Sequence, residues 1–143
     1  MNRSESRATR ILRGLKIAAV LASVVLAAIS CRGTIDMTPP VVVDTTPKSG
    51  EMNADPALKE IRVTFDKDMM TEEMWSWVQE SPDTFPATTG DAHYADKRTC
   101  VLPVALEPGK SYVVWINSER FDSFRSAGGI AATPYKIEFR TRK

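Results

Sequence analysis

Residues 106–117 read Leu106-Glu107-Pro108-Gly109-Lys110-Ser111-Tyr112-Val113-Val114-Trp115-Ile116-Asn117, a tight turn followed by an apolar run. Pro108 presets the backbone for the first corner of such a turn, and Gly109 can adopt the positive φ that the next corner needs. The residues after the turn alternate between a face that begins with Tyr112 and a face that includes Trp115. Because both faces are largely apolar, the stretch predicts a central strand covered on both sides.

The order Leu106, Pro108, Gly109 and Tyr112 resembles the tyrosine corner of immunoglobulin-like and fibronectin type III-like sandwiches. In those domains a tyrosine near the start of the penultimate strand hydrogen-bonds to the chain just upstream. The resemblance implies that these four residues have a structural role and that the fold is a β-sandwich.

Six other segments combine alternating or β-branched residues with turn residues at their ends. They predict strands at residues 41–45, 61–66, 75–78, 93–95, 99–104 and 135–142. Together with the strand that begins at Tyr112, this makes about seven strands, the number expected of a sandwich. Pro103 cannot donate to a ladder and therefore needs an edge or bulge position. Residues 66–74 predict a loop with a short helical turn at Thr71. The sequence thus predicts an all-β, antiparallel β-sandwich over residues 41–143.

The first 30 residues have the layout of a secretory signal peptide. They carry five basic residues against one acidic residue, a net charge of +4, whereas the whole 143-residue chain carries +1, which leaves residues 31–143 at −3. The uncharged apolar run at residues 17–29 is shorter than the roughly 20 residues of a membrane-spanning helix. The charges of the mildly acidic remainder are interspersed, and they give no indication of nucleic-acid binding.

The end of this run, Leu26-Ala27-Ala28-Ile29-Ser30-Cys31, resembles the lipobox of bacterial lipoproteins. The resemblance implies that residues 1–30 are removed and that Cys31 is lipidated and becomes the new N-terminus. That family prefers leucine three residues before the cysteine, where this chain has Ala28. Two alternatives stay open: cleavage after Ala28 or Ser30, which leaves a secreted domain, and an uncleaved N-terminal anchor.

Residues 31–40 predict a short polar tether that ends in Pro39-Pro40 and holds a domain off a membrane. By resemblance to lipoprotein sorting in Gram-negative bacteria, Arg32 carries no inner-membrane retention signal. The expected location is therefore the cell envelope, with the outer membrane favoured, on its periplasmic or surface face. The expected partners are the membrane, through the lipid anchor, and another envelope protein or a polysaccharide.

The body of the chain resembles the bacterial Ig-like domains of surface-layer and other extracytoplasmic proteins. Four marks carry the resemblance in order: residues 40–50, residues 61–69, the turn and tyrosine at residues 106–112, and the closing residues 135–141. Many relatives have an Asp-x-x-Gly-Asn-like turn before the last strand, from which residues 125–129 of this chain depart. The resemblance implies a spacer or adhesion module without catalytic residues.

Two groups of polar residues are candidates for metal binding or catalysis. The densest acidic stretch holds Asp66, Asp68, Glu72 and Glu73, but it has neither the spacing nor the glycine of an EF-hand loop and is interpreted as a solvated loop.

His93 is the single histidine, with Asp91 and Asp96 nearby in the sequence. It would act as a metal ligand or a base only if carboxylates converge on it in a cleft. No nucleophile-elbow motif is present. The sequence therefore predicts no enzyme, no metal and no cofactor.

The aromatic residues are the better candidates for binding. Trp75 and Trp77 either pack in the core or contact a partner or a glycan, since aromatic rings on an exposed sandwich face stack on sugars and anchor proteins. Trp115 is expected in the core. Phe121 and Phe124, with neighbouring arginines, either form a partner-facing loop or pin that loop to the end of the sandwich.

Cys100 lies on a predicted strand and is interpreted as a buried, inert thiol. A Cys31–Cys100 disulfide becomes possible if Cys31 is not lipidated. The function predicted from the sequence is a non-catalytic envelope lipoprotein with a structural or protein-interaction role, and the alternative is a carbohydrate-binding module that uses Trp75 and Trp77.

Overall fold

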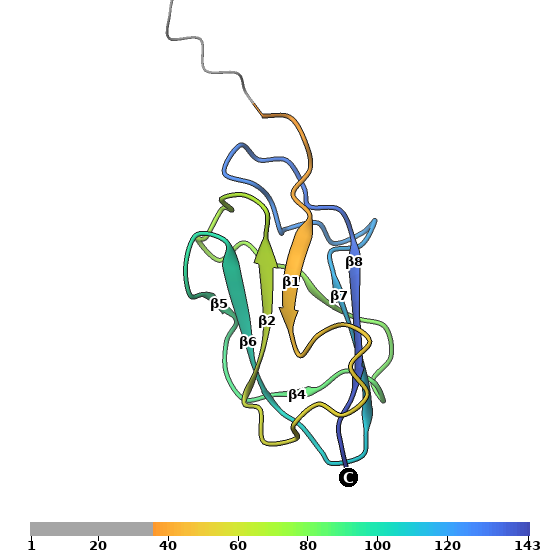
Figure 1. Ribbon diagram of the computed structural model, residues 1–143. Helices are drawn as coiled ribbons and strands as arrows, with labels where there is room; N and C mark the ends of the chain where they lie inside the picture. The colour runs from red at the N-terminus through yellow and green to blue at the C-terminus, as the bar shows by residue number, and fades with distance from the viewer. Residues whose placement is uncertain (1–35) are drawn as a thin grey trace, which may run out of the picture. The chain divides into compact units, whose positions relative to one another are not determined.

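The computed structural model describes residues 36–143, which form two antiparallel sheets packed face to face (Figure 1). One sheet contains, in order, β1 (Val42–Thr46), β2 (Glu60–Phe65), β6 (Thr99–Ala105) and β4 (Ala87–Thr88), with β5 (His93–Tyr94) also paired to β6. The other sheet contains β3 (Trp77–Gln79), β7 (Ser111–Ile116) and β8 (Tyr135–Arg140). The predicted all-β sandwich is confirmed. The predicted signal peptide and Cys31 lie outside the described residues, and the division at residues 30 and 40 stays a prediction.

The core lies between the two sheets. The first sheet contributes Ile61, Val63 and Phe65 of β2, which alternate with outward-facing residues as the sequence pattern predicts. The second sheet contributes Tyr112, Val114 and Ile116 of β7, together with Ile137 and Phe139 of β8. Burial of these large apolar side chains is the main favourable term for the fold.

Strand β7 occupies the centre of its sheet, between β3 and β8. The central position is as predicted, but the cover is uneven, because Tyr112, Val114 and Ile116 face the core while Trp115 on the outer face is only partly buried. The Tyr112 hydroxyl accepts a hydrogen bond from the Glu107 main-chain N–H at 2.8 Å, and Gly109 adopts a φ of 69° in the intervening turn. The Thr141 hydroxyl also stabilises this turn, because it donates to the Glu107 carbonyl at 2.6 Å.

The structure differs from the predicted strands in three places. A short strand, β4, forms within residues 81–91, which were expected to be mainly loop. The strand expected at residues 75–78 begins only at Trp77, so Trp75 lies on the segment that leads into it. The helical turn expected at Thr71 does not form within residues 66–74.

Pro103 lies on β6, which is a central strand rather than an edge strand. Its carbonyl accepts from the Thr89 N–H at 3.1 Å, so its main chain faces the side of β4 and β5. On that side β5 pairs with residues 100–101 and β4 with residues 104–105. The missing N–H of proline therefore falls in the gap between two short partner strands, where no ladder bond is lost.

Candidate binding groove between the sheets

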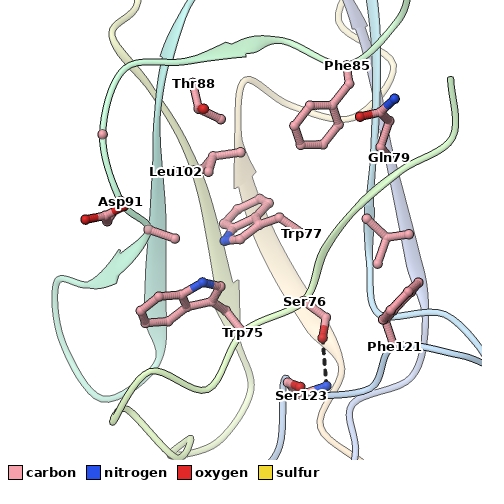
Figure 2. A pocket seen from close by; sticks show the side chains of 13 residues that line it. Trp75, Ser76, Trp77, Gln79, Phe85, Thr88, Asp91, Leu102, Phe121 and Ser123 are labelled. Atoms are coloured by element: carbon pink, nitrogen blue, oxygen red, sulfur yellow. Dashed lines mark hydrogen bonds between the residues drawn. The ribbon is translucent and has the colours of Figure 1, made fainter. Parts of the chain in front are cut away.

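A groove of about 610 Å³ opens along one side of the sandwich, between β3 and the segment that carries β4 (Figure 2). Most of its lining is apolar or aromatic, and its members come from both sheets and from the β7–β8 connection: Trp75, Ser76, Trp77, Val78, Gln79, Phe85, Thr88, Gly90, Asp91, Ala92, Leu102, Phe121 and Ser123. Concave, aromatic surfaces with a few polar groups are the usual form of a binding site.

Trp77 lies in the middle of this groove, between Trp75 and Phe85 in the view of Figure 2. It is the first residue of β3, and its ring packs edge-on against Phe124, with ring centroids 5.6 Å apart. Its indole Nε1 is buried and has no hydrogen-bond partner among the described residues. Trp77 is therefore partly a core residue, and only part of its ring is available to a ligand.

Trp75 separates the groove from a second hollow of about 740 Å³. That hollow is lined by Trp75 with Thr71, Glu72, Glu73, His93 and Tyr94. The Tyr94 hydroxyl donates to the Met74 carbonyl at 3.1 Å, and this bond ties the chain just before Trp75 to β5. Trp75 is half-buried and lines both hollows, so a ligand in either one can reach it.

The β7–β8 connection, residues 117–134, closes one end of the groove. Phe124 is fully buried, and its ring lies 5.2 Å from that of Phe65. Phe121 remains 53% exposed and lines the groove. The Ser123 N–H donates to the Ser76 hydroxyl at 2.8 Å, which joins the connection to the start of β3 (Figure 2). The loop is therefore attached to the end of the sandwich through Phe124, whereas Phe121 stays on the surface.

The Asn117 side chain holds the β7–β8 connection in place through hydrogen bonds, a role that was not predicted from the sequence. Its side chain is fully buried, and its φ of 57° lies in the left-handed region that asparagine tolerates. The amide nitrogen donates to the carbonyls of Phe124 and Ala132, and the amide oxygen accepts from the Phe124 N–H, each at 3.0 Å. An asparagine at the end of an otherwise apolar strand was the available signal.

Cys100 lies on β6 and is fully buried. Burial raises the pKa of its thiol to about 12. A thiol that stays protonated at neutral pH is a poor nucleophile, in agreement with the inert role predicted for it.

The candidate catalytic groups do not converge. His93 is exposed and lines the second hollow, whereas Asp91 lines the groove. The Asp96 carboxylate accepts from the main-chain N–H groups of Arg98 and Thr99, and these bonds hold its pKa below the usual range. Asp96 therefore caps the turn into β6.

The acidic stretch is also divided. Asp66 accepts from the Val41 N–H at 2.9 Å, and Asp68 pairs with Arg98 at 2.8 Å, while Glu72 and Glu73 face the second hollow. Within residues 36–143 no group of three histidine, cysteine or acidic side chains is placed to hold a metal ion. The same part of the chain contains no helix long and apolar enough to cross a bilayer.

The prediction that Trp115 belongs to the core is wrong. Its ring lies on the outer face of β7 and is only partly buried, because Tyr112, Val114 and Ile116 form the inner face. The Trp115 indole N–H donates to the Glu80 carboxylate at 2.6 Å across that outer face. Hydrophobic alternation could not tell the two apolar faces apart.

Residues 36–41, the last part of the predicted tether and the start of the body, are attached to one end of the sandwich. The Lys67 ammonium contacts the Asp36 carboxylate at 2.7 Å and the Thr38 hydroxyl at 2.6 Å. The Thr133 N–H donates to the Pro40 carbonyl at 2.9 Å. These contacts place Asp36 beside the loops that follow β2 and β7.

Comparison with known proteins gives one family match. The model of a family described as bacterial Ig-like domain matches residues 36–141. A solved structure of surface layer protein SbsC, domains 1–6, is 16% identical and covers 74% of this chain with a TM-score of 0.46. This chain spans 14% of the length of that structure. No curated protein matches the chain.

Proposed function

Because the chain belongs to the bacterial Ig-like domain family, we propose that it is a non-catalytic cell-envelope lipoprotein whose Ig-like domain is anchored through a lipidated Cys31. Domains of this family are generally non-catalytic and serve as structural or interaction modules. The family match over residues 36–141 carries the structural or interaction role, whereas the anchor is proposed from the leader sequence alone.

The anchor is supported by the order of features in the sequence. A basic segment, an uncharged apolar run, Ser30 and then Cys31 precede the domain directly. The described structure begins at Asp36 and is already held by Lys67, so only residues 32–35 separate Cys31 from the domain. The five steps from Cys31 to Asp36 span at most about 18 Å, and a lipid on Cys31 would therefore keep the domain close to the membrane surface.

A non-catalytic role is supported by the division of the polar groups. His93, Asp91 and Asp96 lie in different surroundings, and Cys100 is buried and protonated. An acyl transfer or a hydrolysis needs a nucleophile and a base within hydrogen-bond reach. None of these groups meets that requirement with another.

The anchor is tested by intact mass and detergent partitioning of the chain expressed in a bacterium, with Cys31→Ser as the matched control. We expect the wild-type product to lose about 30 residues, to gain the mass of acyl chains and to enter the detergent phase. In the control, both the loss of about 30 residues and the acyl mass should be abolished. An unmodified soluble wild-type product would instead make this a secreted domain and reopen the Cys31–Cys100 disulfide.

Carbohydrate binding through Trp75 and Trp77 is the alternative. The groove that both residues line favours it, since stacked sugars need aromatic surface in a hollow. The packing of Trp77 counts against it, because its ring stands against Phe124 and its N–H is buried. The two indoles therefore do not form a flat, exposed platform.

A further inference from the structure

The two lateral sides of the sandwich are built differently. On one side the segment that follows β1 covers the outer edge of β8: the Gly50 N–H donates to the Glu138 carbonyl at 2.6 Å, and the Arg140 N–H donates to the Glu51 carbonyl at 2.7 Å. The Ala54 N–H continues this pairing to the Arg140 carbonyl at 3.0 Å. The chain itself thus covers this edge, which would otherwise be open to another strand.

The opposite side is open at β3. The Ser76 carbonyl accepts from the Asn117 N–H at 3.1 Å, which shows that Ser76 faces β7. Main-chain groups alternate in an antiparallel ladder, so Val78 also faces β7, whereas the N–H and C=O groups of Trp77 and Gln79 point away from it. In residues 36–143 no other main-chain group bonds to these two residues on that side.

The open edge coincides with the groove. The side chains of Trp77 and Gln79 line the groove (Figure 2). Phe85, which precedes β4, and Leu102 of β6 line it as well. An edge strand beside an apolar groove is the arrangement that accepts an extended peptide, because the main chain pairs with the strand while alternate side chains enter the groove.

The charge of this side indicates the kind of peptide. The charged lining residues are Asp91 in the groove and Glu72 and Glu73 in the second hollow, with no lysine or arginine among the lining of either. Trp75 lies between the two hollows, and the face of an indole attracts a lysine or arginine cation. The charge of the lining is therefore complementary to a basic segment. A second copy of this chain is disfavoured, because β3 paired with β3 would bring two acidic surfaces together.

We propose that the groove binds an extended, basic peptide segment of another envelope protein, which adds to β3 as a further strand and places a lysine or arginine against Trp75. This inference rests on the proposed role as an interaction module and names the class of its partner. The pairing offers two N–H and two C=O groups, from Trp77 and Gln79, so the affinity should lie roughly between micromolar and millimolar.

The test is a titration of the exported chain, in a nonionic detergent without a sugar headgroup, followed by the indole N–H signals in a two-dimensional NMR spectrum. The probe is a nine-residue peptide that alternates lysine and valine. The chain has three tryptophans. We expect the signals of Trp75 and Trp77 to shift, while Trp115, which is outside the groove lining and bonded to Glu80, serves as the internal reference.

Two altered peptides test the charge preference and the main-chain pairing separately. A version with glutamate in place of lysine should bind at least tenfold more weakly, since its charge has the same sign as the lining. A version with proline in place of the central valines should fail to bind, because proline lacks the N–H that the β3 carbonyls need. Equal binding of all three peptides would overturn the proposal.

Two variants of the chain localise the site. Asp91→Lys, at an exposed position, should weaken binding of the lysine peptide roughly three- to tenfold. Glu138→Lys makes the same charge change on β8, at the covered edge, and should leave the affinity unchanged. The opposite ranking of the two variants would overturn the placement of the peptide.

The same titration with a soluble oligomer of N-acetylglucosamine distinguishes the partner class. Shifts of Trp75 and Trp77 with the sugar and none with the peptide would replace this inference with the carbohydrate alternative. The intact mass of the same sample separates this inference from the proposed anchor. If the chain is acylated but does not bind the lysine peptide at millimolar concentration, the peptide site alone is refuted. If the chain carries no acyl mass but binds the peptide, the anchor alone is refuted.

Discussion

Replacing Asn117 with alanine should destabilise the domain by about 4 kcal/mol. The amide makes three hydrogen bonds to the main chain of the β7–β8 connection and is fully buried. At about 1 kcal/mol of net stability for each bond, their loss accounts for about 3 kcal/mol. The φ of 57° adds about 1 kcal/mol, because alanine tolerates the left-handed region less well than asparagine.

Asn117→Gly separates the two contributions. Glycine adopts a positive φ freely but makes none of the three side-chain bonds. We therefore expect Asn117→Gly to cost about 3 kcal/mol, the part assigned to the hydrogen bonds. Asn53→Ala is the matched control, since Asn53 is exposed and should change stability by less than about 0.5 kcal/mol.

The assay is urea unfolding followed by tryptophan fluorescence, with the free energy of unfolding extrapolated to water. The same variants should also weaken binding of the lysine peptide, because the Asn117 bonds seat Phe124 and the ring of Phe124 packs against Trp77 in the groove. If Asn117→Ala and Asn117→Gly each cost less than about 1 kcal/mol, the amide does not hold the connection and this reasoning fails.

Further predictions concern Tyr112, Cys100 and Lys67. Tyr112→Phe should cost about 1–2 kcal/mol in the same urea assay, since it leaves an upstream N–H without its acceptor; an unchanged midpoint would contradict this role. The thiol of Cys100, in a variant where it is the sole cysteine, should resist labelling at about pH 8 and react fully in urea; rapid labelling of the native chain would contradict its burial. Because burial raises the pKa of Cys100 to about 12, its contribution to stability is complete below the unfolded thiol pKa of about 8.5 and should decline as the pH rises toward 12. Lys67→Ala should speed hydrogen exchange of the Thr38 amide, which donates to Asp36 at 2.9 Å. The contacts with Lys67 and Thr38 lower the pKa of Asp36. Protection of the Thr38 amide in the wild type should therefore persist at neutral pH and be lost only as the pH falls through that lowered pKa. Equal exchange of this amide in Lys67→Ala and in the wild type would show that Lys67 does not hold the segment.

Much of the architecture could be predicted because the strands are amphipathic or doubly apolar. The alternation of Ile61, Val63 and Phe65 marked a strand with one buried face, and the two apolar faces around Tyr112 marked a central strand. These patterns depend on a local period of two residues, which a single sequence displays directly.

The candidate site could be predicted only in part. Trp75 and Trp77 were singled out, but the sequence could not say that Trp77 would pack on Phe124 or that Asp91 would be brought to the same groove. These residues are distant in the chain, and their meeting depends on which strands become neighbours. Strand β4 was missed because two residues give no detectable period.

The sequence by itself determined the fold class and the inner side of each clearly alternating strand, since both are local properties of residue type and spacing. Only the tertiary structure decided that Trp115 faces outward and that Asn117 holds the β7–β8 connection. It also decided that the edge of β8 is covered, while the edge of β3 has no main-chain partner among residues 36–143. The physical reason is that burial and hydrogen bonding are relations between segments, and strand pairing between residues far apart in the chain sets which apolar face is inside and which main-chain groups remain free.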